Sequence, residues 1–248
     1  MTWFGHDGPS LARRLGLPRV EAYAALASTM DEAHQLAAVG APAGTMVVAE
    51  SQTRGRGREG RRWLSRPGAG LWVTMIERPS DAEAVAALSL RVGLALAPAL
   101  EPWSDGAVAL KWPNDLFVGE GKLAGVLVEA RWRGDRPDWV AVGVGVNLVA
   151  PEEVPVPTAH LQGVEPVELL RATSAAIRGA AAAVGPLTPH ERDAFAARDL
   201  AAGRPILAPV PGLVRGIAAS GALLVETAAG VSSHASGSLI FASIEEGC

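Results

Sequence analysis

The densest positive charge in this chain lies in the segment "QTRGRGREGRRW", residues 52–63, which we call the arginine loop. It holds five arginines and three glycines. The guanidinium groups of Arg56, Arg58 and Arg61 can each bind carboxylate or phosphate oxygens through two donors, and glycine lets a backbone approach a ligand closely. The loop is not a P-loop, because GxxxxGK[ST] is absent. It therefore predicts an anion site, for a nucleic acid or for the phosphates of a nucleotide.

A second cluster is defined by residue types that the chain otherwise avoids. Of 22 basic residues only Lys111 and Lys122 are lysines, and Asn114 and Asn147 are the only asparagines. Three of these four lie within "KWPNDLFVGEGK", residues 111–122. An ammonium is a compact point charge whereas a guanidinium is a planar fork, so retained lysines indicate positions where arginine does not serve. A chance pairing is the alternative.

The composition limits the partners of these clusters. A net charge of −4 and a pI near 5.8 oppose a nucleic-acid surface and favour a small anion. The single cysteine, Cys248, and the absence of CxxC or HxxxH pairs argue against disulfides and a zinc site. The longest apolar stretch, residues 139–150, is too short to cross a bilayer, and no leader is evident at the start. We expect a cytoplasmic protein with no membrane or nucleic-acid partner.

Helix and strand patterns supply a framework for both clusters. Ser28 or Thr29 caps a helix that stops at Gly40, and a longer helix is expected from a Ser80 cap to Leu100. Further helices are predicted over residues 166–184 and over 189–199, the last capped by Thr188. Strands are predicted over residues 45–50, 71–77, 107–112, 116–118, 122–132 and 139–149.

The chain divides near residue 200. Beyond it, short apolar runs cut by Gly, Ser and Ala are typical of a small β barrel. We therefore predict an α+β fold, with a mixed β-sheet flanked by helices in a domain over residues 1–200 and a small C-terminal barrel over residues 201–248.

Each single motif also has a reading without function. "GVGVN" ends at Asn147 but lacks the third glycine of a dinucleotide fingerprint, so it fits an interior strand equally well. Asp115 fits an ordinary Pro-Asn-Asp turn, and Lys122 fits a surface lysine at the start of a hairpin strand. Trp63 and Trp112 fit core positions, although each could instead offer a flat face to a base.

Taken together, the motifs resemble the biotin protein ligases. "STMDEA", "AESQTRGRGREGRRW", "LKWPNDL", "GKLAGVLVE" and "GVGVNL" occur in that family's order and approximate spacing, and "RGIAASGALLVE" is similar to its small C-terminal domain. The resemblance implies a class II synthetase-like catalytic domain followed by an SH3-like barrel. It also implies a two-step reaction in which biotin and MgATP form biotinyl-5'-AMP, and a lysine of a biotin carboxyl carrier protein then takes the biotin.

The resemblance also assigns roles to residues. Lys122 and Arg58 would neutralise the α-phosphate, and Asp115 would orient or deprotonate the attacking lysine. ATP and the adenylate would contact Arg58, Arg61, Trp63, Asn114, Lys122 and Asn147. Biotin would contact Ser28, Thr29, Gln52, Gly55, Arg56, Gly125, Leu127, Gly143 and Gly145.

Two departures from the family pattern are visible. Met30 stands where the family usually shows Asn, which removes one polar contact to biotin. The DNA-binding domain that some relatives carry is expected to be absent, so no repressor activity is predicted. An adenine-covering loop is expected within residues 151–162, and a homodimer is possible because relatives form one.

Other functions are open on the sequence alone. A lipoate or octanoate ligase shares the adenylate chemistry, but "KWPNDL" and the polar pair Ser28 and Gln52 favour the urea ring of biotin. A nucleic-acid-binding protein would use the arginine loop without biotin. A member of the family without catalytic activity would bind biotin without turnover.

Overall fold

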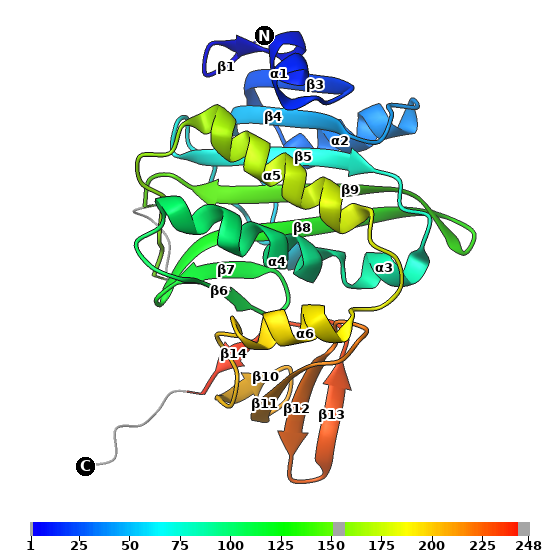
Figure 1. Ribbon diagram of the computed structural model, residues 1–248, viewed down its shortest axis with the longest axis vertical. Coiled ribbons are helices and arrows are strands. Elements are labelled where there is room, and N and C mark those ends of the chain that lie inside the picture. The colour runs from blue at the N-terminus through cyan, green and yellow to red at the C-terminus, as the bar shows by residue number, and fades with distance from the viewer. Residues whose placement is uncertain (1, 151–156, 243–248) are drawn as a thin grey trace.

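The computed structural model describes residues 2–150 and 157–242, and a seven-stranded mixed sheet forms its centre (Figure 1). β3 and β4 are parallel, and every other neighbouring pair in this sheet is antiparallel. The strand order is β3 (Arg19–Leu26), β4 (Thr45–Gln52), β5 (Gly70–Glu77), β9 (Arg136–Asn147), β8 (Gly121–Arg133), β7 (Asp115–Val118) and β6 (Val108–Lys111). The predicted class, a mixed sheet with flanking helices, is confirmed.

Helices cover both faces of this sheet. Figure 1 shows α4 (Leu88–Leu100) and α5 (Pro166–Ala181) lying across one face, whereas α2 (Thr29–Ala38) packs on β4, β5 and β9. Val142 belongs to the larger apolar cluster, and Ala141 belongs to a second cluster with Ala33 of α2. Because successive strand residues point to opposite faces, Gly143 and Gly145 share the α2 side with Ala141. The strand predicted over residues 139–149 is therefore observed as β9 and is buried on both faces.

Two of the predicted helix caps, at Ser28 and at Thr188, are observed. The Ser28 side chain accepts a hydrogen bond from the Asp31 backbone N–H at 3.4 Å and begins α2, and Gly40 has a φ of 91° just after its end. Thr188 and Glu191 form a capping box at the start of α6 (Pro189–Ala196). Side-chain caps satisfy N–H groups that have no partner inside the helix, which is why such signals can be read from sequence.

The structure corrects one helix. The predicted helix from Ser80 to Leu100 is divided at Ala87 into α3 (Ala82–Ala86) and α4, and Asp81 rather than Ser80 caps α3 by accepting from the Glu83 N–H at 2.9 Å. Ala87 is fully buried beside Gly221 of the C-terminal part. The break coincides with this long-range contact, and no local signal in the sequence marks it.

The first 27 residues hold more structure than the sequence indicated. They form β1 (Thr2–Trp3), β2 (His6–Asp7), α1 (Gly8–Leu15) and β3, which adds an edge strand to the central sheet. β3 reads "RVEAYAAL", whose alanines and charges give little strand signal. Its parallel pairing with β4 stabilises a strand that its own sequence favours only weakly.

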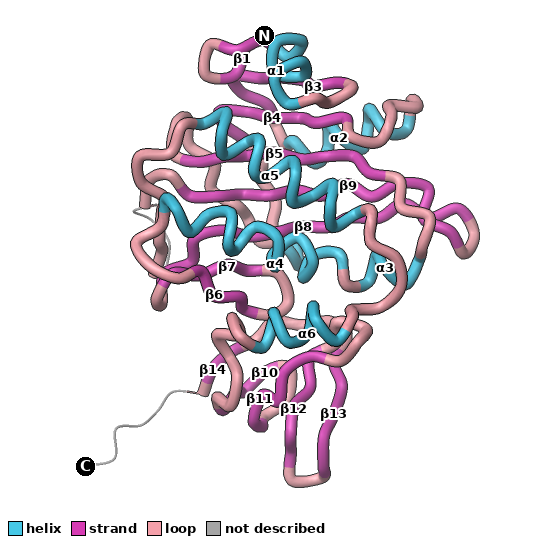
Figure 2. The backbone as a smooth tube through the Cα atoms, viewed as in Figure 1, coloured by secondary structure: helices cyan, strands magenta, loops and turns pink. Residues whose placement is uncertain are grey.

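A second, five-stranded antiparallel sheet lies beyond α6, as Figure 2 shows. Its order is β13 (Gly230–His234), β12 (Leu223–Thr227), β11 (Gly212–Ile217), β10 (Pro205–Ala208) and β14 (Ile240–Phe241). The Trp112 indole N–H donates to the Gly221 carbonyl at 3.0 Å and joins this sheet to the first. The boundary at residue 200 and the closure of these strands into a barrel stay predictions.

None of the described helices is both long enough and apolar enough to cross a membrane.

The buried carboxyl of Asp199 is expected to make the stability of the fold depend on pH. Burial raises the pKa of its carboxyl from 3.8 to about 6, against a hydrogen bond from the Ala201 N–H at 2.9 Å. The folded state therefore binds this proton more tightly than the unfolded state, and stability falls as the pH rises from about 4 to about 6. We expect Asp199→Asn to be about 1 to 2 kcal/mol more stable than the parent at pH 7.5, with the difference shrinking as the pH falls to 4. Urea unfolding at both pH values measures this, and an equal difference at both would contradict it.

Candidate active site

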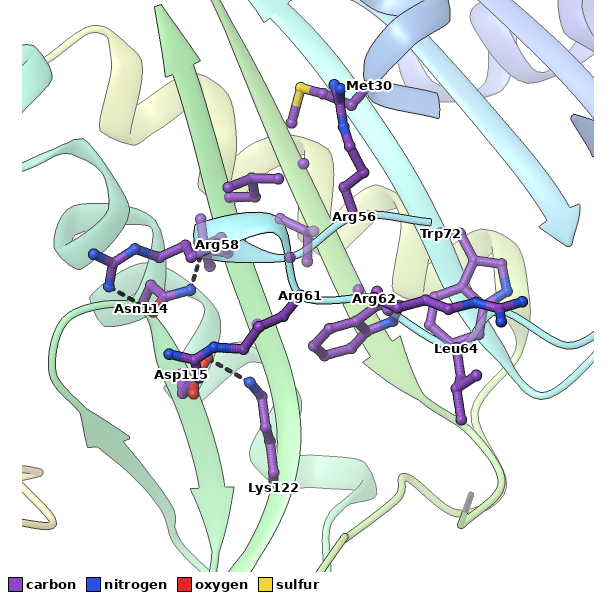
Figure 3. A pocket seen from close by; sticks show the side chains of 18 of the residues that line it. Met30, Arg56, Arg58, Arg61, Arg62, Leu64, Trp72, Asn114, Asp115 and Lys122 are labelled. Carbon is purple, nitrogen blue, oxygen red and sulfur yellow. Dashed lines mark hydrogen bonds and ion pairs between the residues drawn. The ribbon is translucent and has the colours of Figure 1, made fainter. Parts of the chain in front are cut away.

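A cavity of about 500 Å³ lies between the arginine loop and strands β5, β8 and β9 (Figure 3). The turn after β6 forms another wall of the cavity. The predicted site residues that line it are Ser28, Thr29, Gln52, Arg56, Arg58, Arg61, Trp63, Asn114, Asp115, Lys122, Gly125, Leu127, Gly143, Gly145 and Asn147. Residues that are far apart in the sequence are thus brought to one cavity.

Gly55 is the one predicted site residue that does not line this cavity. Its carbonyl accepts the Trp63 backbone N–H at 2.9 Å. A Cβ at Gly55 would lie 2.5 Å from the Trp63 carbonyl oxygen and 2.8 Å from the Ser65 hydroxyl. In this structure Gly55 therefore allows the two sides of the arginine loop to approach each other.

One end of the cavity holds buried neutral polar groups. The Gln52 side-chain oxygen accepts from the Thr29 N–H at 2.8 Å and from the Thr29 hydroxyl at 3.1 Å, and the Gln52 amide donates to Ser65 at 2.9 Å. The Thr74 hydroxyl donates to the Thr29 hydroxyl at 2.9 Å. Ser28 lies at the same helix start and is 1% exposed. Interlocked hydroxyl and amide groups suit a small, uncharged polar ring.

The floor of the cavity is made by glycines of β8 and β9. A Cβ at Gly145 would lie 2.7 to 2.9 Å from the Trp63 indole, and one at Gly125 would lie 3.0 Å from it. A Cβ at Gly143 would lie 2.9 Å from the Met30 methyl group. The Trp63 indole N–H has no hydrogen-bond partner among the described residues. Flat groups can therefore pack directly on the backbone of these strands.

Cations gather at the other end. The Lys122 ammonium lies 2.7 Å from Asp115 Oδ1 and 5.0 Å from the centre of the Trp63 ring. Arg58 Nη1 donates to Asn114 Oδ1 at 3.4 Å and to the Gly237 carbonyl at 3.2 Å. Figure 3 shows Lys122 reaching Asp115, and Arg58 beside Asn114. This end combines the charge and the donor groups that phosphate oxygens require.

The C-terminal part contributes to the same end, which the sequence did not indicate. Arg61 Nη2 donates to Glu59 Oε2 at 2.6 Å and also contacts the Ser238 hydroxyl. Ser238 and Leu239 line the cavity. They come from the segment before β14, so the cavity also includes residues from the C-terminal part of the chain.

Lys111 also lines the cavity. Its ammonium lies 5.0 Å from the centre of the Phe241 ring and 5.6 Å from that of Phe117. Burial lowers its pKa, and the nearby Asp115 charge partly opposes this. The chain's avoidance of lysine was the signal that could have placed Lys111 among the site residues. Thr74 and Trp72 also line the cavity and could not be predicted, because their sequence patterns do not differ from those of core residues.

Asn147 and the segment that begins at Pro157 lie beside Lys122. The Asn147 side-chain amide donates to the Lys122 carbonyl at 3.0 Å and to the Ala159 carbonyl at 3.2 Å. The Lys122 N–H donates to the Pro157 carbonyl at 2.9 Å. Of the predicted adenine loop, residues 151–156 lie outside the described residues, and residues 157–161 border the cation end of the cavity.

Comparisons with known proteins agree with this arrangement. The model of the Biotin/lipoate A/B protein ligase family matches residues 24–147. The biotin–[acetyl-CoA-carboxylase] ligase of Paracoccus denitrificans is 36% identical over 227 residues, covering 82% of this chain and 92% of that protein. Among solved structures, the biotin protein ligase from Aquifex aeolicus in complex with biotin and ATP has a TM-score of 0.74 at 27% identity, covering 90% of this chain and 99% of that one.

Other relatives are longer than the matched segment. The bifunctional ligase/repressor BirA of Bacillus subtilis (strain 168) is 39% identical over 124 residues, which are 50% of this chain and 38% of that protein. The chain thus matches well under half the length of this curated relative. The shared segment contains the arginine-loop and "KWPNDL" motifs on which the resemblance was based. With a family match over residues 24–147 and a relative aligned over most of both chains, the chain belongs to the biotin/lipoate A/B protein ligase family.

Proposed function

We propose that this protein is an ATP-dependent biotin protein ligase that forms biotinyl-5'-AMP and transfers biotin to a lysine of a biotin carboxyl carrier protein. One observation carries the proposal: a single cavity joins a neutral polar end, at Thr29 and Gln52, to a cationic end, at Arg58 and Lys122. A urea ring at the first end and a carboxylate meeting a triphosphate at the second match this division. The name of the Paracoccus relative supports the same activity.

In the first step a biotin carboxylate oxygen attacks the α-phosphorus of ATP. The bond from that phosphorus to the bridging oxygen breaks, and pyrophosphate leaves with the electron pair. The obstacle is repulsion between two anions, which Arg58 and Lys122 reduce by facing the α-phosphate. Preorganised donors of this kind typically contribute about 3 kcal/mol each to a transition state.

In the second step the neutral amine of the carrier lysine attacks the acyl carbon, and the bond from that carbon to the phosphate oxygen breaks to release AMP. Among the described residues that line the cavity, Asp115 is the only acidic one. Its carboxylate lies 2.7 Å from the Lys122 ammonium. We assign Asp115 to orienting the incoming amine and accepting its proton.

We propose that the base of ATP binds beside the cationic end of the cavity. Trp63 and Asn147 would hold adenine, since the Trp63 ring lines the cavity and can offer a flat face to a base. Mg²⁺ would enter with ATP, because this ion usually binds substrate phosphates together with one or two carboxylates. Asp115 could supply such a carboxylate, and the ion would neutralise the departing pyrophosphate. The described residues hold no group of three or more His, Cys, Asp or Glu that could bind a metal on their own.

A lipoate or octanoate ligase is the main alternative, and the polar end of the cavity argues against it. The hydroxyl and amide groups at Thr29, Gln52 and Thr74 offer further hydrogen-bonding capacity that a urea ring can use and an alkyl or dithiolane group cannot. We further propose a cytoplasmic location. A homodimer stays a prediction.

Isotope exchange between pyrophosphate and ATP tests the proposal. Purified protein with Mg²⁺ is assayed in parallel with biotin, lipoate, octanoate and no acid. Exchange with biotin alone is the expected result and identifies both the adenylation and the acid. Exchange with lipoate or octanoate instead would replace the proposed substrate, and no exchange with any acid would refute the activity.

A further inference from the structure

Arg56 is held by two carboxylates of the protein itself. Its Nη2 lies 2.9 Å from Asp31 Oδ1 and 3.4 Å from Glu129 Oε2. Figure 3 shows the Arg56 side chain extending toward Met30, away from Asp115 and Lys122. Two negative charges thus face one guanidinium, so a third carboxylate at this place would meet net repulsion. Arg56 therefore differs from Arg58, which donates to a neutral amide oxygen and a carbonyl and lies no closer than 4.0 Å to the Glu59 carboxylate.

Glu129 is in turn held by a hydrogen bond from His34, which itself accepts one from Trp139. The Trp139 indole N–H, which can only donate, lies 3.0 Å from His34 Nδ1, so this nitrogen accepts and the ring proton is on Nε2. His34 Nε2 then donates to Glu129 Oε2 at 3.0 Å. This hydrogen bond lowers the pKa of Glu129, and the Arg56 charge lowers it further. Glu129 is therefore an oriented carboxylate at neutral pH.

The groups that hold Arg56 belong to rigid elements. Asp31 and His34 are three residues apart on α2, so they share one face of the helix, and Glu129 and Trp139 lie on the adjacent strands β8 and β9. Arg56 belongs to the arginine loop, which forms a wall of the cavity. The contacts therefore tie a loop to the helix and the sheet on the polar side of the cavity.

We propose that Asp31, Glu129 and His34 are positioning residues that hold the arginine loop over the cavity by binding Arg56. Arg56 then retains the ligand by keeping the loop in place, and it does not neutralise the carboxylate of biotin. This role differs from the one that the family resemblance implied for Arg56. The role of these residues in holding the loop does not depend on any ligand, whereas the role of Arg56 in retaining biotin rests on the proposed function.

Trypsin tests the loop without any ligand, because the loop offers five arginines as cleavage sites. Glu129→Gln and Asp31→Asn each keep the size of the side chain and remove its charge. We expect cleavage within residues 54–62 to be at least threefold faster in each variant than in the parent, as measured by mass spectrometry of the fragments. Rates within twofold of the parent in both variants would overturn the proposal.

A matched control separates this effect from a general loss of an ion pair. Arg215 and Glu226 form an exposed pair on the second sheet. Glu226→Gln should leave cleavage of the arginine loop unchanged, and thermal melting must show that each variant remains folded at the digestion temperature. If Glu129→Gln does not fold, Asp31→Asn, at a half-buried side chain in the first turn of α2, provides the deciding rate.

Calorimetry with two ligands tests the consequence for binding. Biotin carries a carboxylate, whereas its primary amide has the same shape without the charge. If Arg56 acts by holding the loop, Arg56→Ala weakens both ligands by a similar factor, and adding Glu129→Gln produces little further loss. A loss at least tenfold larger for biotin than for the amide would return Arg56 to a direct contact with the ligand. Failure of the parent protein to bind either ligand would refute the proposed function, while the proteolysis result would still decide the role of the loop.

Discussion

We expect Lys122→Ala to lower the rate of biotin-dependent pyrophosphate exchange by about 10²- to 10³-fold while changing the dissociation constant of biotin by less than about threefold. The reason is the position of the ammonium, 2.7 Å from Asp115 at the cationic end of the cavity, away from the polar end. A contact that matters mainly when charge builds on the α-phosphate changes the rate much more than it changes ground-state binding. Single-turnover adenylation and calorimetry measure the two quantities.

Lys122→Arg is the conservative comparison for this prediction. It keeps the positive charge but replaces a compact ammonium with a planar fork, which cannot occupy the same position between Asp115 and the Trp63 ring. We expect it to recover only part of the lost rate. Arg171→Ala on the outer surface of α5 controls for loss of a positive charge elsewhere. Equal losses in exchange rate and biotin affinity for Lys122→Ala would refute a role in the transition state.

We expect the second large effect from Gly145→Ala, with biotin binding weakened by about 10- to 100-fold. The added Cβ would lie 2.7 to 2.9 Å from the Trp63 indole, well inside contact distance. Gly145 is on β9, which is paired with β5 on one side and β8 on the other, so its backbone cannot move away. Overpacking of this kind typically costs about 1 to 3 kcal/mol, which corresponds to a change of that order in affinity.

Gly143→Ala provides a matched comparison on the same strand and the same face. Its Cβ would meet the Met30 methyl group at 2.9 Å, and this is the end of a flexible side chain that can adopt another rotamer. We therefore expect a smaller loss than for Gly145→Ala, measured by the same calorimetry. The reverse order of the two variants would show that Met30, and not Trp63, forms the restrictive wall.

The family membership could be predicted from local sequence. The arginine loop and "KWPNDL" carried the resemblance, and the family match over residues 24–147 confirms it. The retention of lysine at positions 111 and 122 pointed to residues that line the cavity. Caps such as Ser28 and Thr188 were readable because the side chain and the N–H that it satisfies are only three residues apart.

The tertiary structure decided which of these groups meet. The arginines of the loop are equivalent in the sequence, yet Arg56 binds Asp31 and Glu129 whereas Arg58 reaches Asn114 and Gly237. The break at Ala87 likewise lies at a contact with Gly221, which is distant in the sequence. Helix caps and strand patterns depend on near neighbours and so can be read from sequence. Partners up to 179 positions apart, such as Arg58 and Gly237, are set by how sheets and helices pack, which local patterns do not specify.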